Sequence, residues 1–217
     1  MPVRVICISQ TMGAGGEAVG RSAAEALRFR YVDEEIVLKA AEKHDLDPKL
    51  VADVETRKSI LRRYLEELGE SAGLDMYDAY GYFAFYGQAL GEAPAPTSEG
   101  MRDLIRQVIR ETADEGNVVI GSHAASIALA GRDDILRVLV TASPETRARR
   151  VADGPLDVKQ AAKAVKESDA ARANYFRRFY RIDRELPTHY DVVVNTDVLS
   201  TDAAAELLAY AARTRDG

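Results

Sequence analysis

The sequence predicts one α/β domain in which a parallel sheet is covered by helices on both faces. Short apolar runs rich in β-branched residues alternate with longer amphipathic stretches, and a glycine-rich segment follows the first apolar run. Parallel strands that are buried on both faces give continuous apolar runs of this kind, and helices usually connect them. The chain of 217 residues has a suitable length for one sizeable domain.

The candidate strands share a short length, many β-branched residues and turn-forming residues directly after them. They span residues 3–8, 117–120, 135–141 and 190–194, and a shorter apolar pair lies at 31–32. We therefore expect a central parallel sheet of about five strands.

Helices are expected to connect the strands in the first half of the chain. One helix begins after the glycines and ends near Arg28, and Asp33 is placed to cap the next one. Residues 47–91 have helical character and end at a proline-containing break over residues 92–100. Ser98 is placed to cap the helix that follows this break.

The second half continues the alternation of strands and helices. Ser143 and Pro144 supply a capping hydroxyl and a first-turn proline, and they predict a helix after the strand at 135–141. Residues 157–184 form an arginine-rich segment with helical character, and an amphipathic helix is expected from about Asp202.

The composition limits the classes of function. Hydrophobic residues make up 47% of the chain, which is enough for a core, and the net charge of −6 disfavours a nucleic-acid polymer as partner. The single cysteine, Cys7, lies in the first apolar run and is expected in the core. No signal-peptide pattern and no apolar run of about 20 residues is present, so we expect a soluble cytoplasmic protein without a membrane partner.

The glycine-rich segment SQTMGAGGEAVG, residues 9–20, is the best candidate for a ligand site. Backbone N–H groups that converge at the start of a helix, together with the helix dipole, favour an anion. We interpret the segment as a phosphate site. Its candidate phosphate-binding residues are Ser9, Gly13, Ala14, Gly15, Gly16 and Glu17.

Three interpretations of this segment compete. Residues 13–18 fit the dinucleotide pattern G-x-G-x-x-G/A with Asp33 at a suitable distance, but four residues separate the strand from the first glycine. The longer loop suits a mononucleotide P-loop, in which Gln10 replaces the first glycine, Gly16 the lysine and Glu17 the magnesium-binding hydroxyl. A tight strand–helix turn without a ligand is the third interpretation.

Taken together, six segments of the chain resemble the cytidylate-kinase-like family, P-loop relatives of the nucleoside monophosphate kinases. Their order and spacing carry the resemblance over nearly the full length, and the family's loop usually lacks the Walker lysine. The segments are ISQTMGAGGEAVG at 8–20, YVDEEIV at 31–37, VVIGSHA at 118–124, ILRVLVTASPETRARRV at 135–151, ESDAARANYFRRFY at 167–180 and YDVVVNTD at 190–197.

The resemblance implies a P-loop NTPase-like three-layer sandwich formed by a single domain over residues 1–217. It places a helical acceptor-binding insert at about residues 45–100 and an arginine-bearing lid at about residues 152–185. The implied activity is transfer of the ATP γ-phosphate, with Mg²⁺, to a (d)CMP-type nucleotide without a covalent intermediate. Small-molecule nucleotides are then the partners, and the oligomeric state, including a homodimer, stays open.

Candidate catalytic and acceptor residues also follow from the resemblance. Asp169, Arg172 and Tyr175 match the family's D-x-x-R-x-x-Y, and Arg150 follows a strand where this class reaches its lid. Asp169 and Arg172 lie at i and i+3, where they can form an ion pair. The resemblance makes Arg150, Asp169 and Arg172 the catalytic candidates and Asp33 and Arg57 the acceptor-binding candidates, with no metal ligand from the protein.

The sequence departs from the family at positions that bear on activity. Gln10, Glu17 and Glu34 stand where the family tends to carry arginine, and Ser122-His123 stands where Gly-Arg-Gly is frequent. Phosphoryl transfer depends on positive charge around the transferring group, and a carboxylate at Glu17 repels phosphate unless magnesium lies between them. The alternative is therefore a weak or inactive nucleotide-binding regulatory protein of the same fold.

Other side-chain groups leave alternatives open. Aromatic residues at 77–86 could stack on a base, form the core of the insert or contact a second copy. Arginines interleaved with aromatic residues at 176–184 could bind RNA, although an amphipathic lid helix explains them better. His44, His123 and His189 are scattered and do not have metal-ligand spacing.

Overall fold

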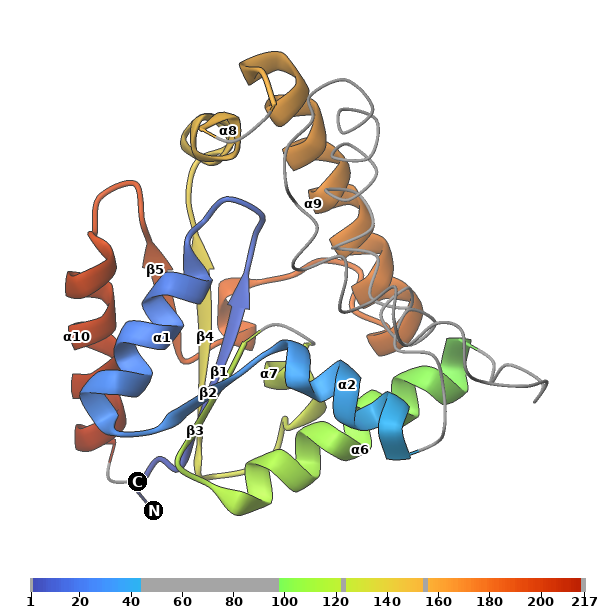
Figure 1. Ribbon diagram of the computed structural model, residues 1–217, viewed down its shortest axis with the longest axis vertical. Helices are drawn as coiled ribbons and strands as arrows, with labels where there is room; N and C mark the ends of the chain where they lie inside the picture. The colour runs from blue at the N-terminus through green and yellow to red at the C-terminus, as the bar shows by residue number, and fades with distance from the viewer. Residues whose placement is uncertain (1, 44–97, 122–123, 154–155, 216–217) are drawn as a thin grey trace.

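A five-stranded parallel sheet forms the centre of the computed structural model, which describes residues 2–43, 98–121, 124–153 and 156–215 (Figure 1). The strand order is β2-β3-β1-β4-β5, and every neighbouring pair is parallel. The predicted α/β fold with a parallel sheet of about five strands is confirmed. The strands are β1 Val5–Gln10, β2 Arg30–Val32, β3 Val118–Gly121, β4 Ile135–Thr141 and β5 Val192–Asn195.

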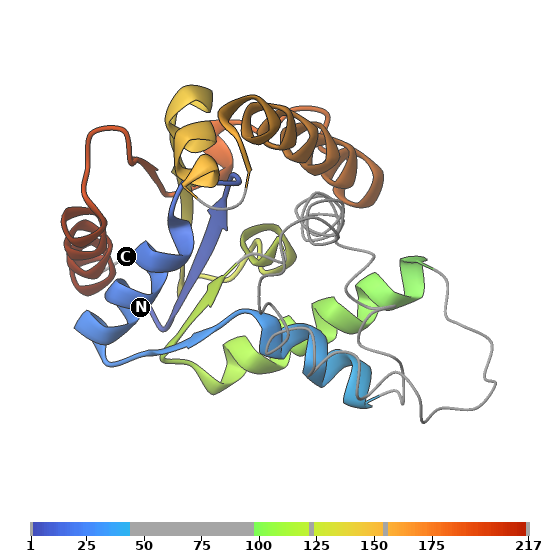
Figure 2. The same cartoon turned by 45° about the horizontal axis from the view of Figure 1, so that its top comes forward.

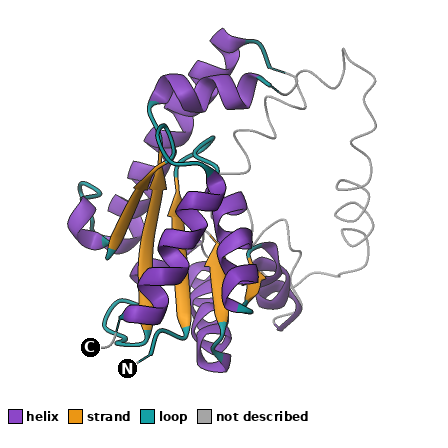
Figure 3. Cartoon of the chain, turned by 90° about the vertical axis from the view of Figure 1, so that its left-hand side faces the viewer, coloured by secondary structure: helices purple, strands orange, loops and turns teal. Residues whose placement is uncertain are grey.

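Helices cover both faces of this sheet (Figure 3). Helices α1 and α10 pack on one face, and α2, α6 and α7 pack on the other. Helices α8 and α9 pack on each other beyond the carboxyl ends of the strands (Figure 2). Their bounds are α1 Gly16–Leu27, α2 Glu34–Lys43, α6 Ser98–Glu115, α7 Ala125–Ala128, α8 Pro144–Ala152, α9 Val158–Tyr180 and α10 Thr201–Thr214, with a 3-10 turn η1 at Pro187–His189.

Strand β1 shows why the first apolar run is continuous. Val5 and Cys7 point to the face covered by α2 and α6, whereas Ile6 and Ile8 point to the face covered by α1 and α10. All four side chains are at most 1% exposed. Burial raises the pKa of the Cys7 thiol to about 12, so Cys7 is the core residue that the sequence predicts.

The sheet brings the loops of the candidate site to one edge. Strand β1 lies between β3 and β4, and its last residue, Gln10, pairs with Val140 of β4. The chain crosses from β1 to β2 on one side and reaches β4 on the other, so the strand order reverses beside β1. Ligands of open α/β sheets bind at the carboxyl ends of the strands next to such a reversal.

Local sequence signals set the helix starts near this edge. Ser143 accepts a hydrogen bond from the N–H of Thr146 at 3.3 Å with Pro144 at the first helical position, as predicted for α8. Helix α9 starts with a capping box between Asp157 and Gln160. Helix α10 starts at Thr201 with Ser200 as its cap, close to the predicted start.

Several expectations concern residues outside the described ranges. These are the helical acceptor insert, apart from residues 98–100, the aromatic residues at 77–86, and the side chains of His44, Arg57, Ser122 and His123. They stay predictions.

The ion pair between Asp191 and Arg137 provides a test of what joins β5 to β4. Burial raises the pKa of Asp191, but hydrogen bonds from the Arg137 side chain and N–H lower it below its usual value. A carboxyl whose pKa is depressed by folding stabilises the fold above its unfolded pKa of about 4, and this stabilisation is lost as the pH falls through the folded pKa. Asp191→Asn should therefore lower the free energy of unfolding by about 1–3 kcal/mol at neutral pH.

The difference should shrink in urea titrations at about pH 3. Asp183→Asn is the matched control, because the Asp183 side chain is 93% exposed and lies 3.8 Å from its arginine partner. An equal loss for Asp191→Asn at both pH values would contradict the assignment.

Candidate phosphate-binding site

The glycine loop, residues 11–15, joins β1 to α1 and has a shape that only glycine adopts readily. Gly13 and Gly15 both have φ of +77°, in the left-handed region. A Cβ on Gly13 would lie 2.7 Å from the carbonyl oxygen of Arg147, whereas one on Gly15 would have no atom within 4 Å. The loop is therefore packed on α8 at Gly13 and open at Gly15.

Among the described residues, no side chain caps the N–H groups at the start of α1. Gly15 occupies the N-cap position and makes no side-chain capping hydrogen bond. The first N–H groups of a helix have no acceptor within the helix, and their partial positive charge attracts anions. The Glu17 carboxylate accepts hydrogen bonds from Arg21 at 3.0 and 3.1 Å, so it is engaged along α1.

Thr196 and Arg150 tie the glycine loop to the end of β5. The Thr196 hydroxyl donates to the carbonyl of Ala14 at 2.8 Å. Arg150 donates to the Thr196 hydroxyl at 2.9 Å and its carbonyl at 2.8 Å, and to the Gly13 carbonyl at 3.3 Å. These bonds join α8, the loop and β5.

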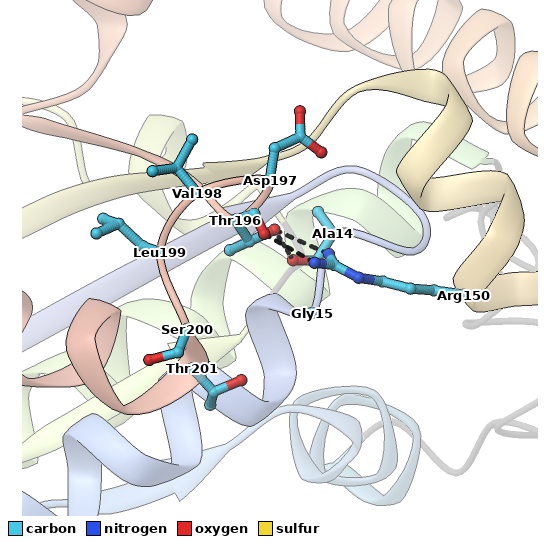
Figure 4. A pocket seen from close by; sticks show the side chains of 9 residues that line it. All are labelled: Ala14, Gly15, Arg150, Thr196, Asp197, Val198, Leu199, Ser200 and Thr201. Atoms are coloured by element: carbon cyan, nitrogen blue, oxygen red, sulfur yellow. Dashed lines mark hydrogen bonds between the residues drawn. The ribbon is translucent and has the colours of Figure 1, made fainter.

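A pocket of about 520 Å³ opens beside this junction (Figure 4). Ala14 and Gly15 form the side of the pocket nearest the glycine loop. The segment that leads from β5 into α10 forms the opposite side. The pocket lies next to the uncapped start of α1. Its lining residues are Ala14, Gly15, Arg150, Thr196, Asp197, Val198, Leu199, Ser200 and Thr201.

Arg147 contacts the glycine loop and pairs with Asp169. Its guanidinium is buried and donates to both carboxylate oxygens of Asp169 at 2.8 and 2.7 Å, and to the Met12 carbonyl at 3.5 Å. The expected pair between Asp169 and Arg172 does not form. Packing of α9 on α8 brings Arg147 to Asp169 instead, and Arg172 pairs elsewhere.

Arg172 is buried at the end of β1 and has a protein acceptor for each of its nitrogens. Its Nε donates to Glu185 at 2.8 Å, its Nη1 to the Gln10 carbonyl at 3.2 Å and its Nη2 to the Ser9 hydroxyl at 2.8 Å. The ring of Phe176 lies 4.5 Å from the guanidinium carbon. Burial lowers the pKa of Arg172, but hydrogen bonding to Glu185 more than offsets this effect.

Tyr190 completes the cluster around Arg172. Its hydroxyl donates to Ser9 at 3.2 Å and contacts Glu185. Burial, the largest effect, raises the pKa of Tyr190 to about 12, so the phenol stays protonated at neutral pH. We call Ser9, Arg172, Glu185 and Tyr190 the Arg172 cluster.

Asp33 lies on the other side of the loop, between the ends of β2 and β3. The Cβ of a side chain at Gly121 would lie 3.4 Å from the Asp33 carboxyl carbon and 2.3 Å from the Tyr31 hydroxyl. Burial and the nearby Asp33 raise the pKa of Tyr31. The guanidinium of Arg21 stacks on the Tyr31 ring at 4.5 Å. Asp33 therefore occupies the carboxyl edge of the sheet, where the acceptor side was expected.

The predicted residues that the structure describes thus fall into four groups. Gly13 to Glu17 form the loop and helix start, with Arg150 beside them. Ser9 and Arg172 lie together in the buried Arg172 cluster, and Asp169 supports Arg147. Asp33 lies apart, beside Tyr31.

Sequence reasoning missed Thr196, Glu185 and Tyr190 as site residues. Thr196 had a usable signal, because it lies two residues after the last predicted strand, where open sheets place ligand loops. No local pattern identifies Glu185 as the partner of Arg172.

Two further findings concern the described residues. Within residues 2–43, 98–121, 124–153 and 156–215, no three His, Cys, Asp or Glu side chains are grouped to hold a metal ion. None of the helices in these ranges is long and apolar enough to cross a membrane.

The same segments that build this site fall within a known protein family. Residues 5–198 match the cytidylate kinase-like family. The chain belongs to this family. A cytidylate kinase of Methanopyrus kandleri is 29% identical to this cytidylate kinase-like chain over 108 residues, which cover 46% of the chain and 56% of that protein.

Two other similarities cover more of the chain. A cytidylate kinase of Aeropyrum pernix is 30% identical over 160 residues, which cover 70% of this chain and 92% of that protein. The crystal structure of an uncharacterized protein from Eubacterium ventriosum ATCC 27560 superposes with a TM-score of 0.64 at 15% identity. It covers 98% of this chain and 99% of that one, and it shares the fold.

The Arg172 cluster can be tested through stability. Glu185→Gln removes the carboxylate and leaves the buried guanidinium charged, which should cost about 3 kcal/mol of unfolding free energy in denaturant titrations. Glu206→Gln, at an exposed position of α10, is the matched control and should change stability by less than about 0.5 kcal/mol. Equal effects of the two substitutions would show that Glu185 is not the required partner.

Proposed function

We propose that this chain is a nucleoside monophosphate kinase that transfers the γ-phosphate of ATP to a (d)CMP-type nucleotide. One observation carries the proposal: the uncapped start of α1 opens beside a pocket of about 520 Å³ in a member of the cytidylate kinase-like family. The relatives from Methanopyrus kandleri and Aeropyrum pernix are named cytidylate kinases, which supports the acceptor class.

The site residues fit the polyphosphate and nucleoside of ATP. The N–H groups at Gly15 to Glu17 suit the phosphate chain, and the space above Gly15 lets it approach the backbone. The adjoining pocket has a volume typical of small-molecule sites, and residues 196–201 would contact the nucleoside. Asp33 and Arg57 are our proposed acceptor-binding residues, the latter within the proposed insert at about 45–100.

Magnesium fits this site mainly through the nucleotide. Kinase Mg²⁺ is usually held by one or two carboxylates together with substrate phosphates, so a dedicated cluster of protein ligands is unnecessary. Bound Mg²⁺ would neutralise part of the phosphate charge. It would also reduce the repulsion between the phosphates and the Glu17 carboxylate.

The protein's own contribution would be positioning and charge. Arg150 lies beside the loop and the pocket, where its guanidinium would face the phosphates while keeping the loop attached to Thr196. Asp169 would act by orienting Arg147, and Arg172 by fixing the end of β1. We place these residues in a lid at about 152–185 and the preceding helix of a single domain. No covalent intermediate is needed, because phosphoryl transfer depends on alignment and electrostatic stabilisation.

A catalytically weak or inactive nucleotide-binding protein is the second candidate. Arg147, Arg150 and Arg172 all donate hydrogen bonds to protein acceptors, and two of them pair with carboxylates. The positive charge near the loop is therefore already partly neutralised, and transfer between two anionic nucleotides would be slow. This candidate predicts nucleotide binding without turnover.

A coupled assay with MgATP and CMP, dCMP, UMP or AMP separates the two candidates. The kinase predicts turnover with at least one acceptor, and Arg150→Ala should reduce kcat/KM by about 10-fold or more through the loss of a charge-assisted contact. Arg149→Ala is the matched control, because Arg149 is the exposed neighbour and donates to Thr146 at 3.1 Å.

Absence of turnover, with a rise in melting temperature at millimolar MgATP, would favour the inactive binder. Absence of both effects would contradict both candidates.

A further inference from the structure

Gln10 and Gly16 face each other across the base of the glycine loop. Gln10 is the last residue of β1, and Gly16 is the first residue of α1. A Cβ on Gly16 would lie 2.7 Å from the Gln10 Cβ and 2.8 Å from its Oε1. The Gln10 side chain therefore fills the space into which a side chain at position 16 would extend.

A lysine-bearing P-loop has the opposite arrangement of side chains. In G-x-x-x-x-G-K-[ST], the first position is glycine and the seventh is the lysine that reaches the β- and γ-phosphates. Position 10 corresponds to that glycine and position 16 to that lysine. This chain has a side chain where the P-loop has none, and none where the P-loop has its lysine.

The amide of Gln10 is also available to a ligand. The side chain is partly exposed, and among the described residues no protein group hydrogen-bonds its amide. Its backbone is fixed, because Arg172 donates to the Gln10 carbonyl at 3.2 Å. The Thr11 hydroxyl has no hydrogen-bond partner among those residues either, but it is buried and closed to solvent. The other polar groups at the loop, on Arg150 and Thr196, are bonded to protein acceptors.

We propose that positions 10 and 16 have exchanged the roles of the P-loop glycine and lysine. The Gln10 amide then donates hydrogen bonds to the terminal phosphates of the bound nucleotide. This inference rests on the proposed nucleotide site and adds a residue to it. An amide N–H is a neutral donor, so it binds phosphate more weakly than an ammonium does. The loop therefore recognises phosphate without a cation of its own.

Substitutions at position 10 test this role through binding of tripolyphosphate, ATP and AMP, measured by calorimetry. Gln10→Ala should weaken the binding of tripolyphosphate and ATP about 10-fold. Gln10→Glu should weaken it more, and Gln10→Lys should strengthen it. AMP lacks the terminal phosphates and should bind these variants equally. Gln107→Ala on α6 is the matched control and should change none of the affinities.

An equal change for ATP and AMP would overturn the inference, since it would assign Gln10 a structural role. Unchanged tripolyphosphate affinity in Gln10→Ala would overturn it as well. Both results leave the proposed kinase activity intact, because turnover is measured separately. Loss of turnover with a Gln10-dependent affinity for tripolyphosphate would remove the kinase and retain the inference.

A double substitution tests the exchange itself. Gly16→Lys alone should lower the melting temperature, because the new Cβ meets Gln10. Gln10→Gly removes all three contacting atoms, Cβ, Cδ and Oε1, whereas Gln10→Ala keeps the Cβ. Gln10→Gly/Gly16→Lys should therefore recover the melting temperature and bind ATP at least as tightly as the unmodified chain. A double variant that is no more stable than Gly16→Lys would contradict the proposed exchange.

Discussion

The burial of the Arg172 guanidinium is the constraint on which the geometry of this site depends. A buried charge is costly unless a counter-charge and hydrogen-bond acceptors surround it. Glu185 supplies the counter-charge, while the Ser9 hydroxyl and the Gln10 carbonyl supply acceptors at the end of β1. Helix α9 is thereby attached to the strand from which the glycine loop departs. The position of the loop follows from this attachment.

Two further arginines are bonded around the rest of the loop. The buried Arg147 pairs with Asp169, and the exposed Arg150 donates to Thr196 and to the Gly13 carbonyl. These arginines hold the loop in place while much of their charge is used within the protein. In the proposed site, phosphate would be bound mainly by backbone N–H groups, which are preorganised but carry only partial charge, with Arg150 beside them. The proposed role of Gln10 is consistent with such a weakly charged site.

The fold could be predicted because its signals are local. Side chains along β1 alternate between the two buried faces of the sheet, which gives a continuous apolar run. Ser143 with Pro144 marks the start of α8. The side-chain partners could not be predicted in this way. Spacing along a helix favoured Asp169 with Arg172, but the packing of α8 on α9 gave Asp169 to Arg147, since contacts between elements depend on tertiary arrangement. The glycine loop could be identified from the sequence. Its hydrogen bonds to Thr196 could not be predicted, because they depend on the order of the strands in the sheet.

The central claim is that the start of α1 binds the nucleotide's phosphates through backbone N–H groups. Titration of ¹⁵N-labelled protein with MgATP, followed by amide chemical shifts, tests this most directly. The claim predicts that the Gly15, Gly16 and Glu17 amides show the largest saturable shifts, because their N–H groups would gain phosphate acceptors. Saturable binding that leaves these three amides unchanged would contradict it.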